Sequence, residues 1–167
     1  ELSQIEDEAC PTCGSCSGMY TANTMNCLTE ALGMGLPGNG SIPAVYSERL
    51  RLAKRAGMQI LHVLKANLRP RNIMTAEAFE NAVALDMALG GSSNTALHLP
   101  AIAHEAGVSL TLDDFERLAQ RVPQLSKLSP SGQYFMEDIH AAGGITAVLK
   151  RLAENGALHK DCATVTL

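Results

Sequence analysis

Apolar residues recur at intervals of three and four along most of this chain, and glycine or proline interrupts each run. Such spacing is typical of amphipathic helices, because positions three and four apart share a helix face. The 167 residues are enough for one ordinary domain with a core. Aromatic residues make up 4% and tryptophan is absent, so the core must consist of Leu, Ala, Ile, Val and Met. We therefore expect a predominantly α-helical fold of six or seven helices.

Breaks in the apolar pattern delimit the first helices. One covers residues 17–32 and is followed by the loop GLPGNGS. A second covers residues 44–66 and carries an apolar stripe on one face. Seven residues form that stripe: Leu50, Ala53, Gly57, Ile60, Leu61, Leu64 and Leu68.

Capping signals place the later helices. Thr75 is the expected N-cap of a helix that runs to residue 89. After the segment GGSSNT, the next helix should kink or restart at Pro100 and end at Gly107.

The last third of the chain continues in the same way. Thr111 and Asp114 fit a capping box, and the pair Gly143–Gly144 separates the last two helices. The few short strands that we expect lie near residues 108–110 and 163–167.

Composition and charge exclude several classes of protein. Hydrophobic residues make up 46% and charged residues 18%, as in soluble globular proteins. The net charge of −4 and the lack of a basic stripe exclude a nucleic-acid-binding surface. No apolar run approaches the ~20 residues that span a bilayer, so no membrane partner is expected. Five cysteines without a secretory signal favour a reducing compartment, and we expect a cytoplasmic protein.

Three cysteines, Cys10, Cys13 and Cys16, follow one another at intervals of three in the segment CPTCGSCSG. A ferredoxin-type run would continue with another cysteine and a proline, and Tyr20 stands there instead. A closed zinc site needs four ligands, and no second ligand pair is evident. A redox pair should follow a strand, which is missing. A metal site and a tight turn of small residues both remain possible from spacing alone.

Cys16 is the best metal-ligand candidate of the three on physical grounds. It lies at or just before the expected helix start, where free N–H groups stabilise a thiolate. Cys27, within the helix, and Cys162, near the end of the chain, are expected to be buried or inert.

The segment GGSSNT, residues 90–95, leads into a helix. Flexible glycines, hydroxyls and free N–H groups at such a position can hold a carboxylate or phosphate. The alternative is an ordinary glycine cap followed by a new helix. None of the five histidines pairs with a partner at ligand spacing, and no acid pair or catalytic triad stands out.

Three stretches of the chain together resemble the dihydroxy-acid dehydratase family. They are ACPTCGSCSGMYTANTMNCLTEALGMGLPGNGS, NAVALDMALGGSSNTALHLPAIAHEAG, and HAAGGITAVLKRL with the terminal TVTL. The resemblance covers essentially the whole chain. Its CPTCGSC form is similar to the branched-chain enzyme rather than to the sugar-acid dehydratases of the same superfamily.

The resemblance implies a hydro-lyase that removes water from 2,3-dihydroxy-3-methyl carboxylic acids. The products are 2-oxo acids on the way to valine, isoleucine and pantothenate. Family members hold an iron–sulfur cluster, of the 2Fe–2S or 4Fe–4S type, with three cysteines and one open iron. A magnesium ion positions the substrate, and a serine alkoxide takes the C2 proton.

Only part of this site transfers to the present chain. Aligning the TANTMN segment with the sugar-acid relatives places their single cysteine on Cys16. The other cluster cysteines, the magnesium ligands and the serine base belong to parts of the family that this chain lacks. The resemblance therefore implies no catalytic residue here. Ser93 and Asn94 are candidates for contact with the substrate.

We therefore expect residues 1–167 to form a partial N-terminal, cluster-binding domain of an α/β dehydratase. Alone it should be inactive and hold neither cluster nor Mg²⁺. The intact protein should be a homo-oligomer, a dimer or higher. The alternatives are a sugar-acid dehydratase of the same superfamily, an independent cysteine-rich metal or electron-transfer module, and a helical interaction domain.

Overall fold

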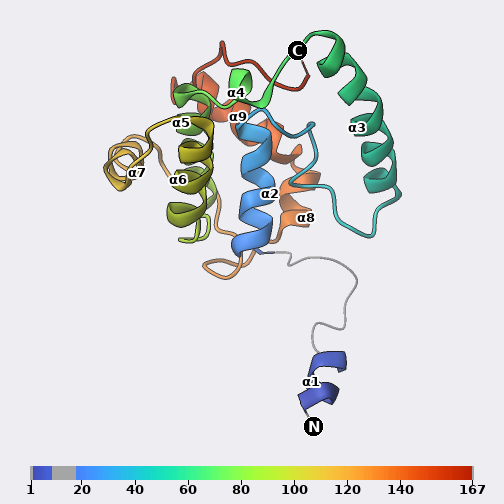
Figure 1. Ribbon diagram of the computed structural model, residues 1–167. Helices are drawn as coiled ribbons and strands as arrows, with labels where there is room; N and C mark the ends of the chain where they lie inside the picture. Colours follow the sequence, from blue (N-terminus) through green and yellow to red (C-terminus); the bar gives the residue numbers. More distant parts are fainter. Residues whose placement is uncertain (1, 9–17, 167) are drawn as a thin grey trace.

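The computed structural model describes residues 2–8 and 18–166 of the chain (Figure 1). These residues are mostly helical, as the sequence predicts. The helices within the described ranges are α1 (Leu2–Glu8), α2 (Thr21–Ala31), α3 (Ser47–Lys65), α4 (Pro70–Ile73), α5 (Ala76–Leu89), α6 (Thr95–Ala106), α7 (Leu112–Ala119), α8 (Met136–Ala141) and α9 (Gly144–Glu154).

Helix α5 lies at the centre of the fold. Ten of its 14 residues are buried, and it packs against α2, α6, α7 and α9. Four of the ten are alanines, whose small side chains let the neighbouring helices approach closely. Figure 1 shows α2, α6 and α9 gathered around it. This arrangement explains how a core with few aromatic residues can be closely packed.

The capping predictions are confirmed. The Thr75 hydroxyl accepts a hydrogen bond from the Ala78 N–H at 3.4 Å. Thr111 is the N-cap of α7, and the Asp114 carboxylate accepts its backbone N–H at 2.9 Å, as the expected capping-box variant requires. Gly107 ends α6 in the left-handed conformation. These caps satisfy backbone groups that a helix end leaves without partners.

Three details of the helix prediction are wrong. Helix α2 begins at Thr21 rather than at residue 17, and α1 and α4 were not expected. Of the two alternatives at Pro100, a kink or a restart, the restart is excluded, because Pro100 lies inside a continuous α6. The flanking Leu99 and Ala103 are buried, and this packing holds the helix together across the proline.

The strands expected at 108–110 and 163–167 are also absent from the described residues. The described residues contain one isolated β-bridge, between Leu128 and Tyr134. Val108 packs its side chain on the helical core. The Val165 N–H donates to the Gly33 carbonyl at 2.8 Å, a tie to the end of α2 rather than a ladder. The β-branched residues therefore serve packing here.

Helix α3 lies at the edge of the bundle (Figure 1) and turns its apolar stripe outward. Leu50 is 77% exposed and Leu64 75%, whereas Leu52 and Val63 face the body. Among the helices that the structure describes, none is both long enough and apolar enough to cross a membrane.

A buried carboxylate holds the loop between α2 and α3. Glu30 accepts the N–H groups of Gly38 at 3.1 Å and Gly40 at 2.6 Å. Burial raises the pKa of Glu30, and these two N–H groups oppose that rise. The loop thereby comes so close to α2 that a Cβ on Gly40 would lie 2.5 Å from the Cys27 Cα.

We expect Gly40→Ala to destabilise the protein by about 2 kcal/mol, because overpacking against backbone forces the loop away from α2. The matched control is Gly57→Ala on α3, where an added Cβ meets nothing within 4 Å. That change should stabilise the protein by about 0.8 kcal/mol, since alanine is the better helix former. Urea denaturation of both variants measures the two effects. Equal effects of the two substitutions would contradict the close approach at Gly40.

Candidate functional site

Three segments of the chain meet at the start of α2. Residues 18–20 lead into the helix, and the Met19 N–H donates to the Ser129 carbonyl at 2.6 Å. The loop of residues 90–95 contacts the helix from another side, where the Asn94 amide donates to the Thr21 hydroxyl at 2.6 Å. The structure thus brings the GGSSNT segment beside the helix that follows the cysteine run.

Buried polar groups hold the loop of residues 90–95 from beneath. The Ser92 N–H donates to the Thr24 hydroxyl on α2 at 3.2 Å. The Thr95 hydroxyl donates to the Asp86 carboxylate on α5 at 2.7 Å. The Gly91 N–H donates to the Asp86 backbone carbonyl at 3.0 Å. Both central helices therefore fix the position of this loop.

The outer side of the loop carries polar side chains. Asn94 is exposed, and its amide donates to the Ser92 hydroxyl at 3.1 Å as well as to Thr21. Ser93 is exposed beside it. The alternative of an ordinary glycine cap also describes part of this loop, because Gly90 ends α5 in the left-handed conformation. The predicted contact of Ser93 and Asn94 with a substrate stays a prediction.

The first turn of α2 is free of groups that would repel an anion. It contains no acidic side chain, and its N-cap Tyr20 provides no side-chain cap. The positive end of the helix dipole at this position therefore lacks a compensating carboxylate within the helix.

The cysteines fall into two groups. Cys10, Cys13 and Cys16 lie outside the described residues, so their predicted roles stay predictions. Cys27 is fully buried, and burial raises the pKa of its thiol far above the usual range, as expected of an inert cysteine. Cys162 is half-buried, and burial raises its pKa as well.

Two histidines, His140 and His159, lie near carboxylates at the surface. His159 Nε2 lies 2.6 Å from Glu80 Oε2, and His140 Nε2 lies 3.5 Å from Glu48 Oε2. The hydrogen bond from His159 lowers the pKa of Glu80. Within residues 2–8 and 18–166, no three His, Cys, Asp or Glu side chains gather as a metal site would require.

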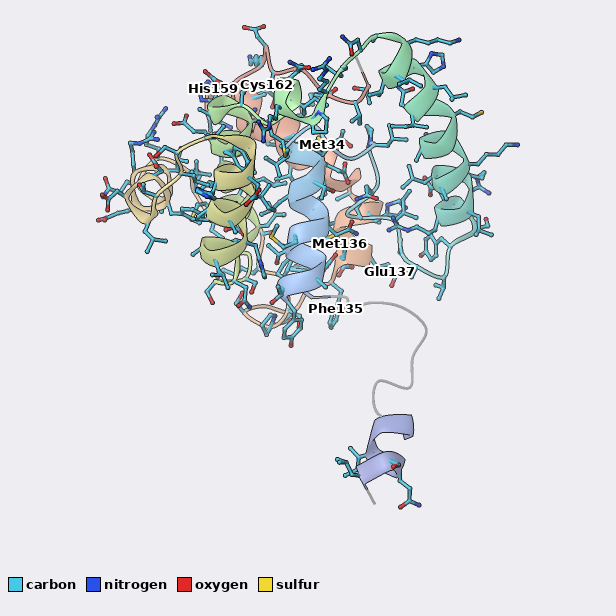
Figure 2. The ribbon with its side chains drawn as sticks, viewed as in Figure 1. Met34, Phe135, Met136, Glu137, His159 and Cys162 are labelled. Atoms are coloured by element: carbon cyan, nitrogen blue, oxygen red, sulfur yellow. The ribbon has the colours of Figure 1, made fainter. Side chains whose placement is uncertain are left out.

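Exposed aromatic side chains lie close to the start of α2. Tyr20 precedes the helix, and Tyr134 and Phe135 follow the loop that binds Met19. Figure 2 shows Phe135 beside the lower end of α2, next to Met136 and Glu137 at the start of α8. An apolar surface beside a polar loop is typical of a face that another part of a protein covers.

Asp86 is the functional candidate that sequence reasoning missed. Asp86 lies within the apolar helix α5 and is 2% exposed. Its Oδ1 atom has no hydrogen-bond partner among the described residues. Burial raises the pKa of Asp86 to about 6, while the hydrogen bond from Thr95 opposes that rise. A lone acid inside the run NAVALDMALGG was the available signal.

Comparison with known proteins shows the class to which this fold and site belong. The sequence model of one family, the N-terminal domain of dihydroxy-acid and 6-phosphogluconate dehydratases, matches residues 1–167. The chain belongs to this dehydratase family.

Individual proteins of this family show how similar the chain is to dihydroxy-acid dehydratases. The chain is 65% identical over 166 residues to the dihydroxy-acid dehydratase of Caldanaerobacter subterraneus subsp. tengcongensis. It is 64% identical over 167 residues to that of Desulfosudis oleivorans, and 58% identical to that of Pyrococcus abyssi. These alignments cover 99–100% of this chain and 30% of each relative. The chain thus spans about 30% of the length of the curated relatives that it matches.

The buried Asp86 should make stability fall as pH rises. The folded protein holds the Asp86 proton up to about pH 6, whereas the unfolded chain releases it near the usual value of about 4. The folded state thus binds more protons across this range, and the free energy of unfolding decreases through it. Asp86→Asn should remove this loss and be more stable than the parent at pH 8 by about 2 kcal/mol.

Urea denaturation of parent and variant at pH 5 and pH 8 measures this difference. Asp114→Asn is a control of opposite sign, because the Thr111 N–H lowers the pKa of Asp114. Its deficit should be the same at pH 5 and pH 8, because it shrinks only below the unfolded value of about 4, as the pH falls toward the folded pKa. A gain from Asp86→Asn that does not change with pH would contradict a raised pKa at Asp86.

Proposed function

We propose that the full-length protein is a dihydroxy-acid dehydratase. It removes water from a 2,3-dihydroxy-3-methyl carboxylic acid and yields the 2-oxo acid used for valine, isoleucine and pantothenate. The observation that carries the proposal is the 65% identity to a dihydroxy-acid dehydratase across 99% of this chain. The relatives' names favour this substrate class over sugar acids, and no observation favours an independent metal module.

We propose Cys16 as a ligand of an iron–sulfur cluster that the rest of the protein completes. Support comes from the position of Cys16, just before the TANTMN helix in the sequence. That helix, α2, begins at Thr21, later than expected, so direct stabilisation of the Cys16 thiolate by the first turn no longer supports the choice. When bound, the cluster supplies a Lewis-acid iron for the departing hydroxyl.

The residues described here take part by binding and positioning rather than by proton transfer. Asn94 and Ser93 offer an amide and a hydroxyl beside the start of α2, groups suited to a carboxylate or hydroxyl of the substrate. The Mg²⁺ ligands and the base are assigned to the remaining parts of the full-length protein. A dimer or larger oligomer and a cytoplasmic location are further parts of the proposal.

Substitution of Cys16 tests the cluster assignment. In the full-length protein, Cys16→Ser should lose the cluster and 2-oxo acid formation, because a neutral hydroxyl replaces a thiolate ligand. Iron and sulfide analysis, absorbance after anaerobic reconstitution and a turnover assay measure the effect. The matched controls Cys10→Ser and Cys13→Ser should retain most of the cluster. Loss of the cluster in Cys10→Ser but not in Cys16→Ser would overturn the assignment.

Substitution of Asn94 tests the proposed substrate contact. Asn94→Ala should raise KM or lower kcat about tenfold while the protein stays folded, since an exposed amide contributes little to stability. The assay is steady-state 2-oxo acid formation by the full-length protein, with circular dichroism to monitor folding. Asn155→Ala on the remote end of α9 is the control, because Asn155 is also exposed and also donates through its amide. If Asn94→Ala left kcat and KM unchanged, the proposed substrate contact would be wrong and the loop would have a purely structural role.

A further inference from the structure

At the position of Asp86, burial of an apolar side chain would cost less free energy than burial of a carboxylate. Its neighbours along α5, Leu85 and Ala88, are fully buried and apolar. A buried carboxylate costs several kcal/mol unless hydrogen bonds compensate for the loss of water. Among the residues that the structure describes, the hydrogen bond from Thr95 is the only side-chain contact that opposes this cost. The stability of the bundle alone therefore gives no reason for an acid at this position.

The loop of residues 90–95 instead supplies hydrogen bonds to both the carboxylate and the backbone carbonyl of Asp86. The Gly91 N–H donates to its backbone carbonyl, and a Cβ on Gly91 would lie 1.9 Å from its Oδ1. The carboxyl group therefore fills the space that a side chain on residue 91 would need. Thr24 on α2 closes the other side, because its Cγ2 would lie 2.8 Å from the same Cβ. Only glycine fits between these two groups without displacing the loop.

Thr95 connects Asp86 to the outer part of the loop. It is 2% exposed, and its hydroxyl lies 2.7 Å from Asp86 Oδ2 and 2.9 Å from the Ser92 carbonyl. The Thr95 hydroxyl thus contacts both the Asp86 carboxyl group on α5 and the backbone of Ser92. The side chain of Ser92 in turn supports Asn94. Ser92 Oγ in turn accepts from both the amide and the backbone N–H of Asn94, at 3.1 and 3.3 Å.

We propose that Thr95 and Asp86 are positioning residues for substrate binding, because they hold Ser92 and Asn94 against Thr21 at the start of α2. The inference rests on the proposed dehydratase function. It adds to that function a buried pair that itself touches no substrate. Thr95 and Asp86 fix the polar side chains of the loop of residues 90–95 in the positions at which they bind a hydroxyl or carboxylate of the substrate.

Thr95→Val is the first test, because valine keeps the shape and removes the hydroxyl. In the full-length protein, kcat/KM should fall about tenfold or more, since misplaced binding groups reduce productive complexes. Asp86→Asn retains a polar partner for Thr95 and should therefore lower kcat/KM less than Thr95→Val does. The control Thr111→Val removes a similar threonine–aspartate bond of 3.0 Å at the start of α7. It should lower Tm and leave kcat/KM unchanged.

A double variant separates positioning from simple stability. Thr95→Val alone leaves a buried carboxyl without its partner, and the variant is expected to be less stable. Replacing both groups by apolar residues of similar shape, Asp86→Leu with Thr95→Val, should restore Tm. The kcat/KM value should stay low, because the polar link to Ser92 is still missing. Recovery of kcat/KM together with Tm would overturn the proposal, as would an unchanged kcat/KM in Thr95→Val.

Amide hydrogen exchange gives a readout that is independent of catalysis. Thr95→Val should speed exchange of the Ser92 and Asn94 amides about tenfold or more, while core amides of α5 change less. If the parent full-length protein formed no 2-oxo acid, the proposed function would fail, and exchange would still decide the positioning role. Equal exchange at Ser92 and Asn94 in parent and variant would overturn the proposal whatever the activity.

Discussion

The structure depends on the burial of α5 among α2, α6, α7 and α9. Because nearly every face of this helix is covered, the placement of its neighbours follows from the small side chains that it presents. Each alanine of α5 permits a close approach that a larger residue would prevent. The helices α2 and α6 are thereby held with their N-terminal ends near one another. The polar loop of residues 90–95 lies between these two ends.

Two buried acids attach glycine-containing loops to this framework. Glu30 receives two backbone N–H groups from the loop after α2, and Asp86 receives the Thr95 hydroxyl. The two cases differ in how completely the carboxylate is compensated. The oxygens of Glu30 each have a backbone donor, whereas Asp86 Oδ1 has no hydrogen-bond partner in the part of the chain that the structure describes. A poorly compensated buried acid is the usual pattern of a site that gives up stability for function, which agrees with the proposed role of the loop of residues 90–95 in substrate binding.

The exposed apolar surfaces agree with the length of the relatives. Leu50 and Leu64 on α3 and the aromatic residues around the start of α2 are exposed in this chain. The chain spans about 30% of the dihydroxy-acid dehydratases that it matches. Such surfaces are suited to packing against further parts of a longer protein. The start of α2 would then lie at a boundary between this chain and those further parts, which agrees with the cluster site proposed above.

The sequence by itself determined the helical class, the caps at Thr75, Thr111 and Gly107, and the family. These features are local, because a cap or a helix period depends on residues a few positions apart. It also marked GGSSNT as a loop of interest. Only the tertiary structure decided that this loop lies against Thr21, that α3 turns its apolar stripe outward, and that no strand forms at 108–110. Each of these three features depends on which segments, distant in the sequence, pack together. Helical spacing in the sequence does not determine that packing. Asp86 shows the same limit, since one acid in an apolar run acquires its meaning only from the loop folded over it.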